Sequence, residues 1–375
     1  MNPSPEVSPT PDQIIADCAA LFASSPAGGL SARPWDSSGR EHAGKIGLGG
    51  LYAARTLGGA GLDLSDAMRV FEVLGSYDGE YALGWSVHNA GTSAICKNGS
   101  PQLQNVWAAD LTAGREMAGF ALSEQQSGSN PVDMRSTGRW NKDGSLTLNG
   151  RKAWVSLAGV ASIFATVVKM SETPGHRDMI MVAIPADAPG VSFGPAYKIA
   201  GMHHMPVADM LLDNVTIPAD HILLEEGKGL SGALFGIDIA RTCVASASCG
   251  LIENALKVAL DYARARQING APSLELDAIQ RLLGDVATDL ELARLISRKA
   301  ANALGTPDGP RLVAHAKLFA PDAALRAVSA CSQAMGGAGL LAGSGLEKML
   351  HMAQVFKVVD GTSEVQRKII GRSLR

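Results

Sequence analysis

The stretch ARTCVASASCGLIENALKVALDYARAR (residues 240–266) places apolar or small residues at steps of three and four, from Val244 to Tyr262. This spacing predicts a long amphipathic helix with one buried face. The same spacing recurs at residues 279–293, a third helix is predicted at about 311–335, and two shorter helices are expected after the loop GGAGLLAGSG at 336–345. Several such helices in series indicate a helical bundle. Their wide, alanine-rich apolar faces also favour oligomerisation.

The segment before the bundle has the texture of β-structure. Alternating or β-branched runs occur in RSTGRW (135–140), SLTLNG (145–150), IFATVVKM (163–170), DMIMVAIPA (178–186) and ADMLLDNVTIP (208–218). Asp143-Gly144 stands between the first two runs, which is a strong hairpin signal. Strands at this spacing predict a small β-barrel or sandwich.

The N-terminal region is helical again, with glycine-rich turns between short amphipathic segments. Examples are DQIIADCAALFA (12–23), LSDAMRVFEVLGSY (64–77) and residues 100–111. The expected fold class is therefore α+β. Its predicted domains are an N-terminal helical domain at 1–115, a central β-barrel at 116–220 and a C-terminal four-helix bundle at 221–375.

Composition limits the function classes. The chain has 375 residues, of which 33 are basic and 36 acidic, and no long basic run, so nucleic-acid binding is not indicated. The five cysteines are scattered and form no CxxC pair, which favours a reducing compartment. The first residues lack the pattern of a signal peptide, and no run approaches the ~18 apolar residues of a membrane span. We expect a cytoplasmic protein without a membrane segment.

Three local patterns only weakly support a nucleotide, metal or hydrolase site. Gly337-x-Gly339-x-x-Ala342 matches a dinucleotide fingerprint in form, but it follows a predicted helix where that fingerprint needs a strand. The pair His203-His204, taken with His221, has no carboxylate or thiolate partner at a ligand spacing, so no metal site is predicted. No G-x-S-x-G pattern supports a serine hydrolase.

The C-terminal stretch VVDGTSEVQRKIIGRSLR (358–375) allows two interpretations. In the first, Asp360 belongs to a turn before a capped helix, because Ser363 and Gln366 have the spacing of a capping box. In the second, Asp360 is a catalytic carboxylate. The local sequence alone leaves both open.

Several strings in order resemble the acyl-CoA dehydrogenase family of flavoproteins, from about residue 51 to 375. They are FALSEQQSGSN from Phe120, NGRKAWVSLAG from Asn149, DNVTIP from Asp213, GKGL from Gly227, YARARQING from Tyr262, QAMGGAG from Gln333 and VDGTSEVQR from Val359. The family oxidises an acyl thioester at Cα–Cβ, which requires a carboxylate base, a firmly held flavin and donors to the thioester carbonyl.

The resemblance implies FAD as cofactor, an acyl-CoA or acyl-carrier-protein substrate, and electron-transfer flavoprotein or oxygen as acceptor. It implies a homodimer or homotetramer, because the FAD site would be shared between subunits. Asp360 matches the base and Arg241 an arginine beside it. The positions matching FAD contacts are Phe120, Leu122, Ser123, Trp154, Ser156, Arg266, Gln333, Gly336, Gly337, Thr362 and Glu364. The positions matching substrate contacts are Ser129, Asp238 and Gly361.

The chain departs from the family pattern at the base. Asp360 stands where the family has Glu, and Ala240 occupies the place of the glutamate base that some members carry earlier in the chain. The shorter side chain withdraws the carboxylate by about 1 Å, which matters where positioning decides rate. Two alternatives therefore stay open: a flavin oxidase or nitrogen-oxidising enzyme of the nitroalkane oxidase kind, and a non-catalytic flavoprotein or acyl-binding subunit.

Overall fold

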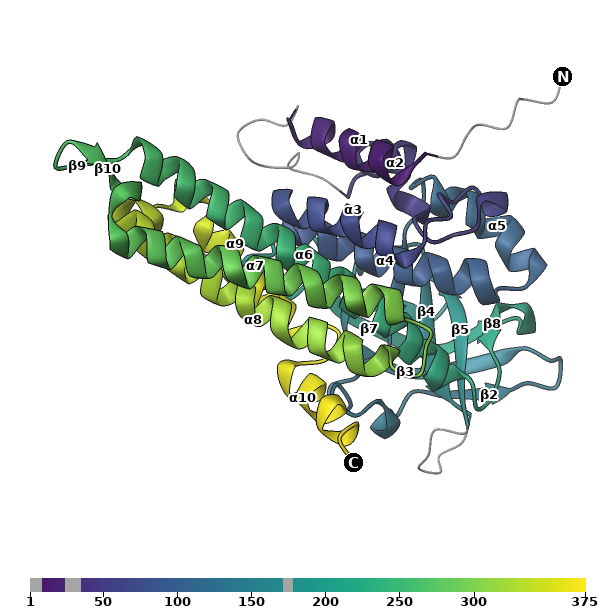
Figure 1. Cartoon of the computed structure of the whole chain (residues 1–375). Helices are drawn as coiled ribbons and strands as arrows, with labels where there is room; N and C mark the ends of the chain where they lie inside the picture. Colours follow the sequence, from purple (N-terminus) through teal and green to yellow (C-terminus); the bar gives the residue numbers. More distant parts are fainter. Residues whose placement is uncertain (1–8, 24–34, 171–177) are drawn as a thin grey trace, which may run out of the picture.

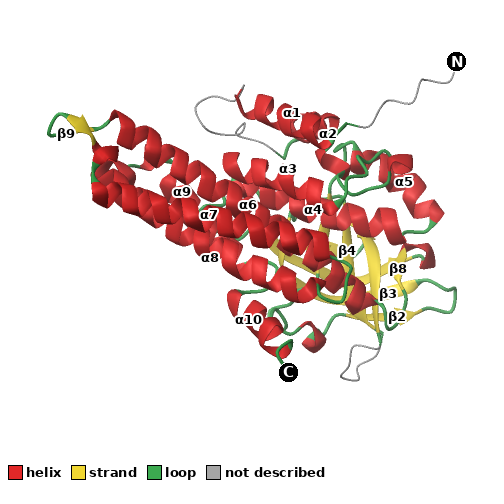
Figure 2. Ribbon diagram, in the orientation of Figure 1, coloured by secondary structure: helices red, strands yellow, loops and turns green. Residues whose placement is uncertain are grey.

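The structure is a computed structural model that describes residues 9–23, 35–170 and 178–375. Residues 1–8, on which the expectation of no signal peptide partly rests, lie outside this range. Helices, a sheet and a second set of helices follow one another along the chain (Figures 1 and 2). This order confirms the predicted α+β fold class.

Five helices form the first part of the described chain. They are α1 (Pro11–Ala23), α2 (Ser37–Ile46), α3 (Leu64–Tyr77), α4 (Gly79–Asn98) and α5 (Pro101–Thr112). Aspartates set two of the boundaries: Asp63 caps α3 through the N–H of Asp66, and Asp78 caps α4 through the N–H groups of Glu80 and Tyr81. Helices α1, α3 and α5 confirm the predicted segments.

The strands form one eight-stranded sheet. They are β1 (Ala118–Ala121), β2 (Thr137–Trp140), β3 (Leu146–Ser156), β4 (Ile163–Lys169), β5 (Met179–Pro185), β6 (Val191–Phe193), β7 (Val207–Ile217) and β8 (Ile222–Leu224). Their order is β6-β7-β3-β2-β4-β5-β8, and β1 pairs in parallel with β4. Strands β2 and β3 form the predicted hairpin, whose turn has Gly144 at φ +84° and Asp143 accepting from the Ser145 N–H.

The C-terminal helices are α6 (Gly229–Ala265), α7 (Asp277–Ala303), α8 (Gly309–Met335), α9 (Leu346–Val358) and α10 (Ser363–Arg372). Helices α6, α7 and α8 pack along one another as the apolar spacing predicted, and α10 packs on α8. The short hairpin of β9 (Gln267–Ile268) and β10 (Ala271–Pro272) joins α6 to α7 at the end of the bundle that points away from the sheet (Figure 1). Within the described chain, α6 alone is long and apolar enough to cross a membrane by length and composition, and 83% of its apolar 18-residue segment is buried inside the protein, as in a core helix.

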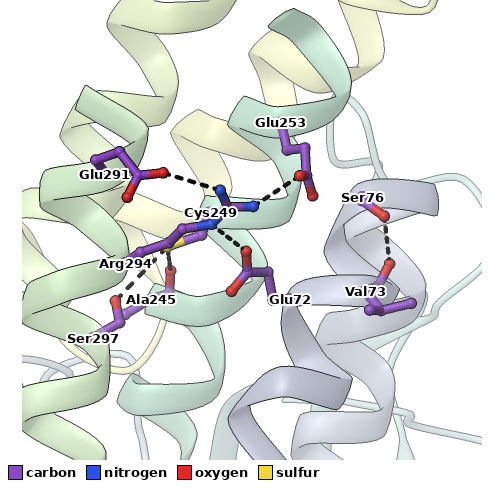
Figure 3. A network of polar contacts seen from close by, with 9 residues as sticks. All are labelled: Glu72, Val73, Ser76, Ala245, Cys249, Glu253, Glu291, Arg294 and Ser297. Carbon is purple, nitrogen blue, oxygen red and sulfur yellow. Dashed lines mark hydrogen bonds and ion pairs between the residues drawn. The ribbon is translucent and has the colours of Figure 1, made fainter. Parts of the chain in front are cut away.

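Arg294 of α7 ties the bundle to the N-terminal helices (Figure 3). Its guanidinium lies 2.6 Å from Glu72 of α3 and 2.8 Å from Glu253 of α6. A cavity of about 330 Å³ lies beside this network, between α3, α6 and α7. Two of the three arginines in its wall, Arg69 and Arg294, are paired with carboxylates, whereas Arg298 forms no ion pair within the described chain. None of the predicted site residues lines it.

Candidate functional site

The turn between α9 and α10 carries Asp360 in an unusual backbone conformation. Asp360 has φ +56° and Gly361 has φ +97°, so two successive residues lie in the left-handed region. For a residue with a side chain this conformation costs about 1–2 kcal/mol, and it persists only where neighbours enforce it. Glycine at 361 removes that cost for the second residue.

Side chains from three helices hold the two carbonyl groups of this turn. Arg241 of α6 donates from Nε to the Asp360 oxygen at 2.7 Å. Lys317 of α8 and Gln366 of α10 each donate to the Gly361 oxygen at 2.8 Å. The turn is therefore fixed from α6, α8 and α10 at once.

The two cations at the turn are themselves buried. Arg241 forms a buried ion pair with Asp238 one helical turn earlier, at 2.8 Å. Burial raises the pKa of Asp238, although the charge of Arg241 opposes this. Lys317 is 1% exposed, and burial lowers its pKa to about 7, while the nearby Asp360 carboxylate acts in the opposite direction.

The side chain of Asp360 has the properties of a proton acceptor. Burial raises its pKa, and the charges of Lys317 and Arg241 limit the rise. Within the described chain its carboxylate has no hydrogen-bond donor, whereas its backbone carbonyl has one. The backbone is thus held, and the carboxylate is left free to take up a proton. Of the predicted site residues, the structure brings together Asp360, Gly361, Arg241 and Asp238 at this turn.

The capping box expected at Ser363 and Gln366 is wrong. The helix begins at Ser363, and Thr362 occupies the N-cap position, with its carbonyl accepting from the Gln366 N–H. The Gln366 side chain donates to the Gly361 carbonyl. It therefore does not bond back to the backbone at Ser363, as a capping box would require. Exposed Glu364 follows, and its own N–H and the Thr362 hydroxyl lower its pKa.

A second group of predicted residues gathers where β1 ends against β3. Leu122 is buried, Phe120 and Ser123 are half-buried, and the Ser123 carbonyl accepts from the Ala153 N–H at 2.9 Å. The register of β3 against β7 shifts between residues 152 and 155, and Trp154 has φ +59° and is 56% exposed. Trp154 stacks on Tyr197 at 4.3 Å between ring centroids, and half-buried Ser156 ends the strand.

A buried ion pair that the sequence did not reveal locks these two segments together. Lys152 of β3 lies 3.0 Å from Glu124, and both side chains are at most 3% exposed. Burial would raise the pKa of Glu124, but the charge of Lys152 and hydrogen bonds from Ser136 and the Arg135 N–H lower it to about 2. A lysine on the inward face of an otherwise alternating strand was the available signal.

A third group of predicted residues lies far from the first two within this chain. Arg266 is exposed at the end of α6, about 37 Å from Arg241 at the 1.5 Å rise of a helix. Gln333, Gly336 and Gly337 are exposed at the end of α8, Gln333 being about 24 Å along the helix from Lys317. Both places lie at the end of the bundle that points away from the sheet (Figure 1). One chain alone does not bring them to Asp360 or Trp154.

A small cavity of about 40 Å³ lies between α4, β5 and the first turns of α6. Phe120 and Ile239 line it, so it adjoins both the end of β1 and the helix that carries Asp238 and Arg241. Lys97 also lines it, with Nζ 5.1 Å from the ring centroid of Phe235. Ser129, the remaining predicted substrate contact, is exposed in the loop after β1.

Metal ligands are not grouped anywhere in the described parts of the chain. His203 and His204 are exposed, and the ring of His221 bonds to the Ala183 carbonyl.

Comparison with protein families gives three matches in series. The N-terminal, middle and C-terminal domains of acyl-CoA dehydrogenase match residues 31–115, 119–215 and 227–375. A cyclohex-1-ene-1-carbonyl-CoA dehydrogenase of Syntrophus aciditrophicus is 30% identical over 84% of this chain and 77% of its own length. A mitochondrial isobutyryl-CoA dehydrogenase of Dictyostelium discoideum is 28% identical over 99% of this chain and 91% of its own.

A solved structure agrees with these relatives. Butyryl-CoA dehydrogenase from Megasphaera elsdenii superposes with a TM-score of 0.91 at 25% identity, over 97% of both chains. The order of domains, the turn with its carboxylate and the extent of these matches lead to one conclusion: the chain belongs to the acyl-CoA dehydrogenase family and is an oxidoreductase acting on CH–CH groups.

Proposed function

We propose that the protein is an FAD-dependent dehydrogenase that oxidises the Cα–Cβ bond of an acyl thioester, with Asp360 as the base that removes the α-proton. The observation that carries this proposal is the Asp360–Gly361 turn, whose backbone is bonded to two buried cations while its carboxylate has no hydrogen-bond donor in the described chain. A base works best when its pKa approaches the working pH, and burial raises the pKa of Asp360 in that direction.

The residues present fit FAD. Exposed Trp154, pushed outward by the register shift in β3, offers a flat aromatic face, with Ser156, Ser123, Leu122 and Phe120 on the neighbouring segments. FAD, when bound, supplies a two-electron acceptor for the hydride that leaves Cβ. Ser156 would orient it by a hydrogen bond.

The pyrophosphate of FAD would be held by the residues at the far end of the bundle. A Cβ added at Gly336 or Gly337 would meet no atom within 4 Å, so the backbone there is open to a ligand. Exposed Arg266 and Gln333 supply a positive charge and an amide nearby. Thr362 and Glu364, at the start of α10, complete the proposed FAD contacts.

The distance between these two groups supports a site shared between chains. About 37 Å of helix separates Arg241 from Arg266, so a second copy would supply the distal end. We therefore expect a homodimer or homotetramer.

The cavity beside Phe120 supports a short acyl group. Its volume is about 40 Å³, which favours a short acyl group over a long one. Asp238 and Gly361 would contact the substrate beside Asp360, and exposed Ser129 would meet the arm of CoA or of an acyl-carrier protein. The isobutyryl-CoA and butyryl-CoA dehydrogenases among the relatives favour short chains as well. We place the enzyme in the cytoplasm, with electron-transfer flavoprotein or oxygen as the acceptor.

The test is anaerobic titration of the purified holoenzyme with a panel of acyl thioesters, read by loss of flavin absorbance. We expect short-chain thioesters to reduce the wild type. Asp360→Asn should slow reduction by roughly 100- to 10,000-fold, because the general base is lost. Asp360→Glu keeps the carboxylate with about 1 Å more reach and should lose less than about 100-fold.

Asp289→Asn is the matched control, because Asp289 of α7 pairs with Arg326 of α8 and has no bond to the turn within the described chain. It should reduce at the wild-type rate. Reduction of Asp360→Asn at that rate would contradict the assignment of the base, and a purified protein without flavin would contradict the cofactor. Peroxide release on admission of air, without another acceptor, would identify an oxidase.

A further inference from the structure

Lys317 stands on the buried face of α8, between Val313 and Ala320, where the helix pattern calls for an apolar residue. Its Nζ lies 3.0 Å from the carbonyl oxygen of Lys357 and 2.8 Å from that of Gly361. These two carbonyls flank Asp360 on either side in the sequence.

The position of the ammonium group explains why the turn can keep its conformation. The Lys357 carbonyl belongs to the last turn of α9, where the helix dipole favours a cation. The Gly361 carbonyl leads into α10. Lys317 therefore joins the end of one helix to the start of the next across the left-handed residue Asp360, while Arg241 holds the Asp360 carbonyl from α6.

We propose that Lys317 is a positioning residue for Asp360: its ammonium group fixes the strained turn and keeps the carboxylate ionised for proton removal. This inference rests on the proposed function, because it presupposes that Asp360 is the base. Lys317 does not touch substrate or cofactor in this proposal; it acts through the turn.

The charge of Lys317 is part of its effect. The titratable and charged groups that face Lys317 and Asp360 are Arg241 and Cys243 of α6, Asp322 of α8, Lys357 of α9 and Glu364 of α10. Lys317 lowers the pKa of Asp360 against the effect of burial. Removal of this cation should raise that pKa, so the carboxylate would ionise only at higher pH.

The experiment compares three variants of the holoenzyme. Lys317→Met keeps the length of the side chain but removes its donors and its charge. Lys317→Gln removes the charge and keeps a donor, and it serves also if the methionine variant does not fold. Lys299→Met is the control, because Lys299 is exposed on α7 and forms no hydrogen bond or ion pair with the turn within the described chain.

Two measurements separate positioning from mere stability. In Lys317→Met, amide hydrogen exchange of residues 358–366 should accelerate about tenfold or more, and flavin reduction should slow on the order of 100-fold with unchanged affinity for the thioester. In both Lys317 variants the acidic limb of the pH–rate profile should move to higher pH. Lys299→Met should match the wild type in all three respects.

Unchanged exchange together with an unmoved acidic limb would overturn the inference. If the wild type itself is not reduced by any thioester, the proposed function fails, and the exchange of residues 358–366 then decides alone whether Lys317 fixes the turn. Faster amide hydrogen exchange with an unmoved acidic limb of the pH–rate profile would show that Lys317 only stabilises the fold. That result would also overturn the positioning role.

Discussion

His88 is held in one neutral form at a junction between the N-terminal helices and the sheet. It is fully buried in α4, its Nδ1 accepts from the Ala118 N–H at 3.0 Å and its Nε2 lies 2.8 Å from the Gly49 carbonyl. Burial lowers its pKa from 6.5 to about 4. In the unfolded chain the ring takes up a proton below pH 6.5, so stability should fall as the pH drops from 6.5 to 4, by ~3 kcal/mol at ~1.4 kcal/mol per pH unit.

The measurement is the thermal unfolding midpoint of wild type and of His88→Gln between pH 7 and pH 4. The variant should be less stable at pH 7, and its midpoint should fall less steeply with acid. His203→Gln is the control, because His203 is exposed. Parallel pH dependence in all three proteins would contradict the assignment to His88.

Among single residues, the sequence predicted those whose role depends on local strings and missed those whose role depends on packing. Asp360 stands in the string VDGTSEVQR, and the structure bonds its carbonyl to Arg241, which the resemblance implied to lie beside it. Lys317 lies 43 residues before Asp360 in the sequence. Only the packing of α8 against the C-terminal turn brings its Nζ to that turn. The sequence shows only that Lys317 is a charged residue on an apolar helix face. It does not predict which carbonyl groups the ammonium group binds.

The junction of β1 and β3 depends on the ion pair between Lys152 and Glu124. Lys152→Met would leave the Glu124 carboxylate buried without its counter-charge. Removal of one partner of a buried pair typically costs about 3–5 kcal/mol, and because Ser136 and the Arg135 N–H still bond to Glu124, we expect the lower end of that range.

A double-mutant cycle tests this element. Lys152→Met, Glu124→Gln and the double variant are compared with wild type by thermal unfolding and by FAD content. The double variant should be more stable than the sum of the single losses predicts, by on the order of 2 kcal/mol, since no buried charge remains. Additive losses would contradict the coupling. FAD content should fall with Lys152→Met if the Ser123 segment moves.

At the level of elements, the sequence was most informative where one face of an element is buried. Helix α3 occupies the predicted residues 64–77. Helix α4 is buried on most of its faces, so it shows no apolar stripe for periodicity to detect. The register shift at Ala153–Trp154 was also invisible, because alternation describes a regular ladder and a shift depends on the partner strand β7. That shift is what exposes Trp154.

On the scale of the whole molecule, the three groups of predicted site residues define two ends of one chain. The turn at Asp360 is held by Arg241 in the part of α6 nearer the sheet and the β1–β3 junction belongs to the sheet, whereas Arg266 and the loop after α8 lie at the far end of the bundle. The family resemblance implied residues in all three groups, but the distance between the two ends follows only from the lengths of α6 and α8. If FAD contacts both ends, each site combines the base of one copy with the distal loop of another.

Hybrid assemblies test this arrangement. Asp360→Asn removes the base and leaves the distal loop intact, whereas Gly337→Asp leaves the base intact and places a carboxylate where the pyrophosphate would lie. A Cβ added at 337 meets no atom within 4 Å, so the second variant should fold. Each variant alone should be reduced poorly by a thioester. A dimer that carries one copy of each, isolated through two different affinity tags, should recover about half of the wild-type sites, because one of its two sites is complete. No recovery would mean that each site is built within a single chain.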